Sequence, residues 1–441
     1  MIEIILALIV FVCAGAYALP RFISSTGRKK IRPELYYIIL MLAAAAGIRI
    51  FCALLFTGHK FDMSCFRSWA SRLASGGPAK FYASDGFNNY PPGYMYILWL
   101  IGKINSVMKL DNNGFNFLLK LPVILADLIC GCGVYRLAMK RSGIKTALIA
   151  AALWLFNPAV IINSSLWGQV DAVYTIVLGL MLYFISTKRL IPAYFAFAAA
   201  ILLKPQSFVL TPILIFGIIE QVFLCGFDNK VFFKNLAFGL GAIATMFLIC
   251  LPFGIEHVIK QYTETLQGNP YFSQNAFNMW GVLGNNYRKV TAVGSIIGYI
   301  LMALSVALTA FVYFRSKNDA KVYFCGGLII LCFYMLSVKV NERYAFAAIL
   351  FFLLAFAQKD DLKNYVMTML ITLSQFFNMA WVLFIFETDN RKYFFDPWIP
   401  LYSGINIPIF IFILYIAFTS YISLTSGKKI LCANKKGGSM K

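Results

Sequence analysis

The sequence predicts an all-α polytopic transmembrane helical bundle of about 13 spans, with a large extracytoplasmic first loop that bears interfacial helices. Of its 441 residues, 60% are hydrophobic and 13% are charged, which leaves more apolar surface than a soluble fold can bury. Several apolar runs exceed the ~18 residues that a membrane span needs, and lipid requires backbone groups to be paired within helices. These runs are continuous and do not alternate with polar residues, which argues against a β-barrel.

The distribution of Lys and Arg predicts which loops face the cytoplasm. The positive-inside rule explains the net charge of +21, so nucleic acid is not an expected partner. The run 1–19 lacks a basic start, so we expect an uncleaved span with its N-terminus outside. Segment 91–109 is apolar, but a crossing there would place Lys140 and Arg141 outside, so we expect an interfacial helix. The remaining spans are expected at 35–57, 118–138, 145–163, 171–186, 190–203, 206–225, 233–252, 292–314, 321–338, 344–357, 363–385 and 398–424.

Unusual polar residues collect on the outer face, although basic loops alone determine this topology. The short outer connections are 167–171 (WGQVD), 204–206 (KPQ) and 340–344 (VNERY). Two long ones are 58–117 and 253–291, and the second is long enough to cover a site or contact an acceptor. Outer loops also collect whatever polar residues the spans exclude. That explanation does not account for ionisable groups beside span ends, where they are costly.

The stretch from Gly58 to Tyr94 is the most informative of these loops. Asp62, Phe66, Trp69 and Leu73 follow the spacing i, i+4, i+7 and i+11, so a helix would place them on one face. A carboxylate at the head of an aromatic face, just outside the membrane, suits a site that receives a lipid-linked substrate.

The ordered motifs FDMSCFRSWASRL…FYASDGFNNYPPGYMYIL, SLWGQVDAVY, LLKPQ and NERYAF resemble the bacterial relatives of GPI mannosyltransferase II, the PIG-V family of the GT-C superfamily. The resemblance covers about residues 35–424. It implies inverting transfer of a hexose, mannose by the family name, from a polyprenyl-phosphate-sugar donor to a glycan or glycolipid acceptor. The site would face outward from a bacterial plasma membrane. Residues 1–34 would be an additional span with a basic loop, 35–424 the GT-C-like domain, and 425–441 a basic cytoplasmic tail.

The resemblance implies that Asp62 is the catalytic residue, because it matches the acid that GT-C enzymes carry in their first outer loop. Inverting transfer needs one base to take the proton of the attacking hydroxyl. The departing lipid phosphate needs positive charge and no second carboxylic acid. The competing interpretation of Asp62 is an acid at a helix N-terminus, where the helix dipole favours it.

Candidate residues for the donor phosphate lie in two other outer motifs. Arg343 offers a bidentate guanidinium, and Glu342 beside it would form its ion pair. Lys204 offers a point charge, with Gln206 two residues later. The competing interpretations are an ion pair that holds a helix end and a lysine that reaches the interface from within the membrane.

The remaining candidate substrate contacts are aromatic, amide and acidic. Gln169 and Asp171 would bind sugar hydroxyls and Trp167 would stack on a sugar face, unless the three form only a polar hairpin. Tyr90 would shape the acceptor side together with the prolines that follow it. The list is completed by Trp69 on the aromatic face and by Arg49, which lies deep in a span and needs a partner, either the donor phosphate or a nearby acid.

Three departures from the family pattern bear on activity. Asn341 stands where the family commonly has His, which removes a titratable donor. Asn88 and Asn89 stand where an acid often precedes the tyrosine, and Asp85 could take that place. These departures keep open a non-catalytic GT-C relative that acts as an assembly partner.

The other alternative is a transporter or lipid flippase for polysaccharide precursors. Such a protein should carry ionisable residues near the midplane of the bilayer, whereas here they collect at one face. No cofactor or metal is expected, because the outer acids are few and dispersed. The expected partners are the lipid-linked sugar donor, the acceptor and the bilayer.

Overall fold

The computed structural model describes residues 33–84, 86–267, 270–386 and 396–422 as an almost entirely helical bundle. The first half contains α2 (Pro33–Leu55), α3 (Lys60–Gly76), α4 (Pro78–Phe81), α5 (Pro92–Met108), α6 (Asn112–Arg141), α7 (Ile144–Leu155), α8 (Pro158–Ile161), η1 (Ile162–Trp167), α9 (Asp171–Ser186), α10 (Leu190–Leu203), η2 (Pro205–Leu210), α11 (Thr211–Ile218) and η3 (Ile219–Leu224). The second half contains α12 (Asn229–Cys250), η4 (Leu251–Phe253), α13 (Ile255–Gln267), β1 (Ser273–Gln274), α14 (Met279–Val282), α15 (Ala292–Arg315), α16 (Lys321–Leu336), β2 (Val340–Asn341), α17 (Phe346–Gln358), α18 (Leu362–Trp381), η5 (Val382–Phe386), α19 (Trp398–Ile416) and η6 (Ala417–Tyr421).

The prediction of an all-α transmembrane bundle is confirmed, but the predicted number of spans is not. The described residues contain eight helices long and apolar enough to cross a membrane, and four shorter apolar helices, α9, α10, α16 and α17. The predicted span at 1–19 lies outside the described residues, as do most of the predicted 1–34 segment and the whole 425–441 tail. The chain is an integral membrane protein.

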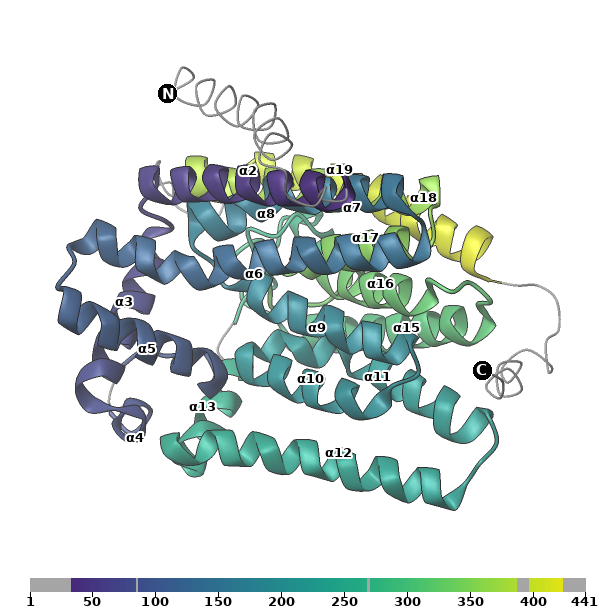
Figure 1. Ribbon diagram of the computed structural model, residues 1–441, viewed down its shortest axis with the longest axis horizontal. Helices are drawn as coiled ribbons and strands as arrows, with labels where there is room; N and C mark the ends of the chain where they lie inside the picture. Colours follow the sequence, from purple (N-terminus) through teal and green to yellow (C-terminus); the bar gives the residue numbers. More distant parts are fainter. Residues whose placement is uncertain (1–32, 85, 268–269, 387–395, 423–441) are drawn as a thin grey trace, which may run out of the picture.

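The centre of the bundle is α17, whose residues from Phe346 to Ala357 are all buried. A helix that is apolar on every side is one that other helices surround completely. In Figure 1, the long helices lie side by side along the horizontal axis, while α3, α4, α5 and α13 gather at one end. The C-terminal end of α6, with Lys140 and Arg141, and the start of α12 lie at the other end.

The helix α5 matches the predicted interfacial segment 91–109 in position. Among the described residues, it is not one of the helices long and apolar enough to cross a membrane. It packs directly on α3 at Gly102, where an added Cβ would meet the carbonyl oxygen of Ala70 at 2.1 Å. The two helices therefore form one packed unit at the end of the bundle.

The long outer connection 253–291 is fixed in the bundle by paired strands and by asparagines. Its strand β1 pairs in parallel with β2, so that Ser273 lies opposite Val340 and Gln274 opposite Asn341. Asn378 of α18 donates to the carbonyl oxygen of Asn275 at 2.6 Å. Asn406 of α19 donates to the carbonyl oxygen of Phe277 at 2.7 Å. This connection therefore sets the position of the strand that leads directly into Glu342 and Arg343.

Candidate functional site

Two tight turns bring the first outer motif against the WGQVD motif. Gly58 and Gly168 adopt φ values of 97° and 85°, a backbone conformation that residues with a Cβ rarely adopt. An added Cβ would meet the Met63 side chain at 2.5 Å at either position. The backbone N–H of His59 also donates to the carbonyl oxygen of Trp167 at 3.0 Å. The start of α3, with Asp62, is thereby placed beside Trp167 and Gln169.

The carboxylate of Asp62 is held through one oxygen. Trp167 Nε1 and Gln169 Nε2 each donate to Asp62 Oδ2 at 2.7 Å. The same oxygen lies 3.5 Å from His59 Nδ1 and 3.8 Å from Arg343 Nη1. Within the described chain Asp62 Oδ1 makes no hydrogen bond or ion pair, and the side chain is 18% exposed. One oxygen is thus fixed and the other is available to a ligand.

A second carboxylate, Asp171, joins the two distant basic motifs. Its Oδ1 pairs with Lys204 Nζ, and its Oδ2 accepts from Asn163 Nδ2 at 2.9 Å. Arg343 Nε lies 3.6 Å from Asp171 Oδ2, while Arg343 Nη1 pairs with Glu342. Asp171, Lys204 and Glu342 are all buried. We call Asp62, Asp171, Lys204, Glu342 and Arg343 the charged cluster.

Aromatic and amide side chains line this cluster. The guanidinium of Arg343 lies 4.8 Å from the ring centroid of Trp167, whose other partner is the stacked imidazole of His59 at 4.7 Å. Tyr90 donates its hydroxyl to Gln169 Oε1 at 3.1 Å, so Gln169 bridges Tyr90 and Asp62. Eight predicted site residues therefore lie together: Asp62, Tyr90, Trp167, Gln169, Asp171, Lys204, Glu342 and Arg343.

Gln206 and Trp69 lie one step further out. Gln206 is half-buried on η2, and its Oε1 makes no hydrogen bond among the described residues. Trp69 is 2% exposed, donates Nε1 to the carbonyl oxygen of Phe87 at 2.7 Å, and packs against Tyr90. Its indole is therefore occupied in shaping the turn before Tyr90, and the prediction that it contacts substrate directly is not supported by this geometry.

Arg49 was predicted to bind substrate or to pair with a nearby acid, and the structure shows the second arrangement. Its side chain is fully buried between α2, α6 and α7, where Arg49 Nε pairs with Asp127 Oδ2 at 2.9 Å. Arg49 Nη1 donates to the carbonyl oxygen of Leu155 at 2.6 Å. The nearby acid, and not a donor phosphate, is the partner that a buried arginine requires.

Lys120 is one of the residues that sequence reasoning missed, and His59 and Asn163 are two others. Lys120 lies on α6, and its Nζ donates to the carbonyl oxygens of Phe56 at 2.6 Å and Ser165 at 2.9 Å. It thereby ties the end of α2 to η1, just before Trp167. A lone lysine near the end of an apolar helix gives no sequence signal for such a role, since it also suits the membrane interface.

The pKa values of two acids in the cluster move in opposite directions. Burial alone raises the pKa of Asp62, but Arg343, His59 and the hydrogen bonds from Trp167 and Gln169 outweigh it, and the pKa falls below the ordinary 3.8. Burial raises the pKa of Glu342 above the ordinary 4.5, although Arg343 opposes this. Burial likewise lowers the pKa of Lys204, against the attraction of Asp171.

These directions predict two infrared signatures. Because its pKa is lowered, Asp62 should show a protonated carboxyl band, absent from Asp62→Asn, only below pH 3.8. Because its pKa is raised, Glu342 should keep such a band, absent from Glu342→Gln, above pH 4.5. Difference infrared spectra recorded from pH 3 to pH 7 check both. An Asp62 band that persists at pH 5 would contradict the assigned electrostatics.

No group of three or more His, Cys, Asp or Glu suited to a metal ion occurs within the described residues. The cluster mixes three acids with two bases at short range, so each carboxylate already has a cation or a hydrogen-bond donor. The chemistry that this arrangement offers directly is proton transfer to a carboxylate and charge stabilisation by a guanidinium.

Comparisons with known proteins support the architecture. The model of the family "GPI transamidase subunit PIG-U" matches residues 72–281. ArnT from Cupriavidus metallidurans, in a structure bound to undecaprenyl phosphate, is similar with a TM-score of 0.51 and 14% identity, over 86% of this chain and 77% of that chain. The fold is of the GT-C type. No curated protein matches the chain.

The two comparisons differ in the part of the site that they include. The family match begins at residue 72 and ends at residue 281, so it contains Tyr90, Gln169 and Lys204 but neither Asp62 nor Arg343. The structural similarity extends over most of the chain. Neither comparison names a mannosyltransferase, so that part of the sequence-based resemblance stays a prediction.

Proposed function

We propose that this GT-C type membrane protein is a glycosyltransferase that moves a hexose, with inversion, from a polyprenyl-phosphate-sugar donor to an extracytoplasmic glycan or glycolipid acceptor. The observation that carries the proposal is the closeness of the Asp62 carboxylate, which has one oxygen without a hydrogen bond, to the guanidinium of Arg343. Both belong to one cluster assembled from four motifs that lie far apart in the sequence. The geometry fits a reaction in which Asp62 accepts a proton and Arg343 stabilises the negative charge of a departing phosphate.

The proposed step assigns the two oxygens of Asp62 different tasks. Oδ2 stays fixed by Trp167 and Gln169, while Oδ1 accepts the proton of the acceptor hydroxyl. The acceptor oxygen forms a bond to the anomeric carbon as the bond from that carbon to the phosphate oxygen breaks. The phosphate keeps the electron pair of the broken bond. The lowered pKa of Asp62 keeps it ionised and ready at neutral pH.

Arg343 is proposed to stabilise the departing phosphate. Its Nη1 already pairs with Glu342, but within the described chain its Nη2 makes no hydrogen bond. Lys204 pairs with Asp171, so we assign it the task of neutralising that acid, with phosphate contact as its further candidate role.

The remaining assignments extend this proposal. Trp167, Gln169 and Asp171 are proposed to contact the sugar, and Tyr90 to shape the acceptor side. Mannose, a bacterial plasma membrane and an outward-facing site follow from the sequence resemblance. So does the division into 1–34, 35–424 and 425–441, with outer loops at 58–117 and 253–291.

A second candidate is a non-catalytic subunit of a membrane complex. The family match to "GPI transamidase subunit PIG-U" favours it, because that description names a subunit. Such a protein would bind a glycolipid at the charged cluster without turning it over.

Turnover of a defined donor separates the two candidates. The full chain, reconstituted in vesicles, is given polyprenyl-phosphate-mannose or polyprenyl-phosphate-glucose with candidate acceptors, and polyprenyl phosphate release is measured. An enzyme releases lipid phosphate only when acceptor is present. Binding of the lipid-linked sugar without release, across the acceptor set, would favour the subunit.

Arg343→Lys should raise the KM for donor and lower kcat/KM roughly 10- to 100-fold, since a hydrogen bond to a charged group contributes about 1.5–3 kcal/mol. Lysine keeps the charge but loses the planar fork. The matched control is Lys260→Met on α13, whose ammonium is 74% exposed and 3.9 Å from Glu264. Unchanged donor dependence in Arg343→Lys would give Arg343 a structural role.

A further inference from the structure

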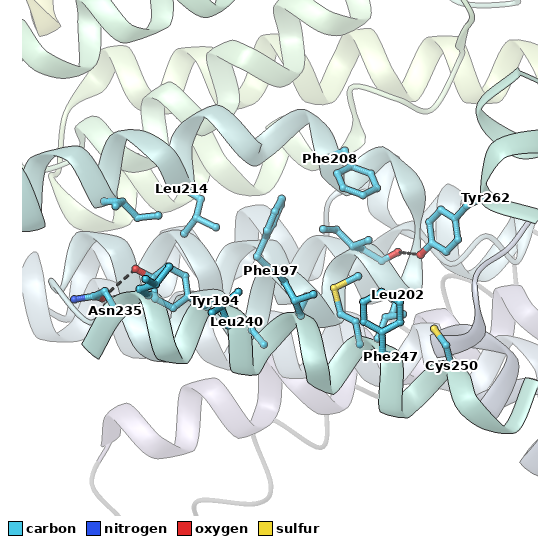
Figure 2. A pocket seen from close by; sticks show the side chains of 18 of the residues that line it. Tyr194, Phe197, Leu202, Phe208, Leu214, Asn235, Leu240, Phe247, Cys250 and Tyr262 are labelled. Atoms are coloured by element: carbon cyan, nitrogen blue, oxygen red, sulfur yellow. Dashed lines mark hydrogen bonds between the residues drawn. The ribbon is translucent and has the colours of Figure 1, made fainter. Parts of the chain in front are cut away.

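An apolar groove of about 860 Å³ lies between α10, α11 and α12 (Figure 2). Phe197, Leu214, Leu240 and Phe247 point into it together with other aliphatic and aromatic side chains. Its volume falls within the ~300–1,000 Å³ typical of small-ligand sites. In Figure 1, α12 runs along the edge of the bundle, so the groove lies where lipid has access.

The polar side chains of the groove are already paired within the protein. Tyr194 donates to Asn235 Oδ1 at 3.0 Å, and Asn235 Nδ2 donates to the carbonyl oxygen of Val231 at 2.8 Å. Tyr262 donates to the carbonyl oxygen of Ile201 at 2.8 Å, as Figure 2 shows. The groove therefore offers hydrocarbon contacts and suits an apolar chain.

A second cavity, of about 940 Å³, adjoins the groove at the end of the bundle away from the charged cluster. Val222 and Asn235 line both cavities, so the two cavities are direct neighbours. The second cavity is predominantly basic. Its lining includes six cations, Arg141, Lys188, Arg189, Lys234, Lys317 and Lys321, and two acids, Glu220 and Asp319.

The cations that line the second cavity outnumber the acids, six against two. Lys321 pairs with Glu220 at 2.9 Å, and Glu220 also accepts from Tyr313 at 2.8 Å. Arg189 lies over the ring of Phe184 at 5.5 Å, at the turn where Lys188 adopts φ 59°. The surplus of cations is suited to an anionic group.

We propose that the groove and the basic cavity form one binding site for an anionic phospholipid, with an acyl chain between α10 and α12 and the phosphate among the cations. Charge decides the orientation. The cations at the opposite end, Lys204 and Arg343, already face three carboxylates, whereas the basic cavity has an excess of cations. The site is separate from the proposed donor site. Its ligand would fill the space between α12 and α10, the helix that ends beside Lys204.

Native mass spectrometry of the purified full chain tests the site with phosphatidylglycerol, phosphatidylcholine and inorganic phosphate. Phosphatidylglycerol should be retained in preference to phosphatidylcholine, and inorganic phosphate should bind negligibly because it lacks the chain. The double variant Arg189→Gln with Lys234→Gln should weaken phosphatidylglycerol binding roughly tenfold or more, since each cation near an anionic headgroup contributes separately. Lys145→Gln, an exposed lysine at the same end that lines neither cavity, is the matched control.

Gly239→Leu tests the groove independently of charge. An added Cβ at Gly239 meets nothing within 4 Å, and leucine favours a helix more than glycine does, so α12 should fold normally. The leucine would project into the groove and should also weaken phosphatidylglycerol binding. Equal retention of both phospholipids, or equal loss in Lys145→Gln, would overturn the proposal. The proposal would also be overturned if undecaprenyl phosphate displaced phosphatidylglycerol and the Arg189 and Lys234 changes left phosphatidylglycerol binding unaltered. That result would assign the groove to a polyprenyl chain.

Discussion

Replacing Asp62 with Asn should lower sugar transfer by roughly 10²- to 10⁴-fold, the usual contribution of a general base. The amide keeps the size of the side chain and can still accept hydrogen bonds from Trp167 and Gln169, so the turn around it should persist. It cannot take a proton from the acceptor hydroxyl. Release of polyprenyl phosphate in reconstituted vesicles measures the loss.

The control for this variant is Glu264→Gln, the same change of acid to amide on α13, where the side chain is 58% exposed. Its transfer rate should equal that of the unchanged protein, because an exposed ion pair contributes little. Normal turnover by Asp62→Asn would remove Asp62 from the mechanism. Loss of turnover with an unchanged melting temperature would locate the defect in chemistry and not in folding.

Replacing Asp127 with Ala should destabilise the bundle by about 3–5 kcal/mol, the usual cost of leaving one partner of a buried ion pair uncompensated. Arg49 would then lie in the membrane interior with only the carbonyl oxygens of Leu155 and Ala45 as acceptors. Denaturation in mixed detergent micelles measures the change.

The double variant Arg49→Met with Asp127→Leu provides the comparison. It removes both charges and fills the space with apolar side chains, which is often close to neutral. The double variant should therefore be more stable than Asp127→Ala alone. A single replacement that costs less than about 1 kcal/mol would mean that water or lipid headgroups compensate the arginine.

Helical periodicity predicted local arrangement well. The spacing of Phe66, Trp69 and Leu73 identified the buried face of α3, with Asp62 at its start, and all three apolar side chains are buried. Local spacing has this power because it depends only on the geometry of one helix.

Contacts between distant motifs could not be obtained in this way. A buried arginine at position 49 requires a partner, but nothing in the sequence selects Asp127, 78 residues later. The charged cluster is assembled from four motifs that lie far apart in the sequence, so periodicity alone could not bring Asp62, Asp171 and Arg343 together. The ordered motifs indicated that these residues share the outer face. The turns at Gly58 and Gly168 then fix the position of the start of α3 relative to the WGQVD motif.

The pairing of β1 with β2 has a consequence for how substrates enter. A hinged cap over the cluster would have to pull Ser273 and Gln274 away from Val340 and Asn341, and also break the amide contacts made by Asn378 and Asn406. Such a motion would dislodge the backbone next to Arg343 each time the cap opened. The lipid-linked donor is therefore expected to enter sideways from the bilayer and not beneath a lifting flap.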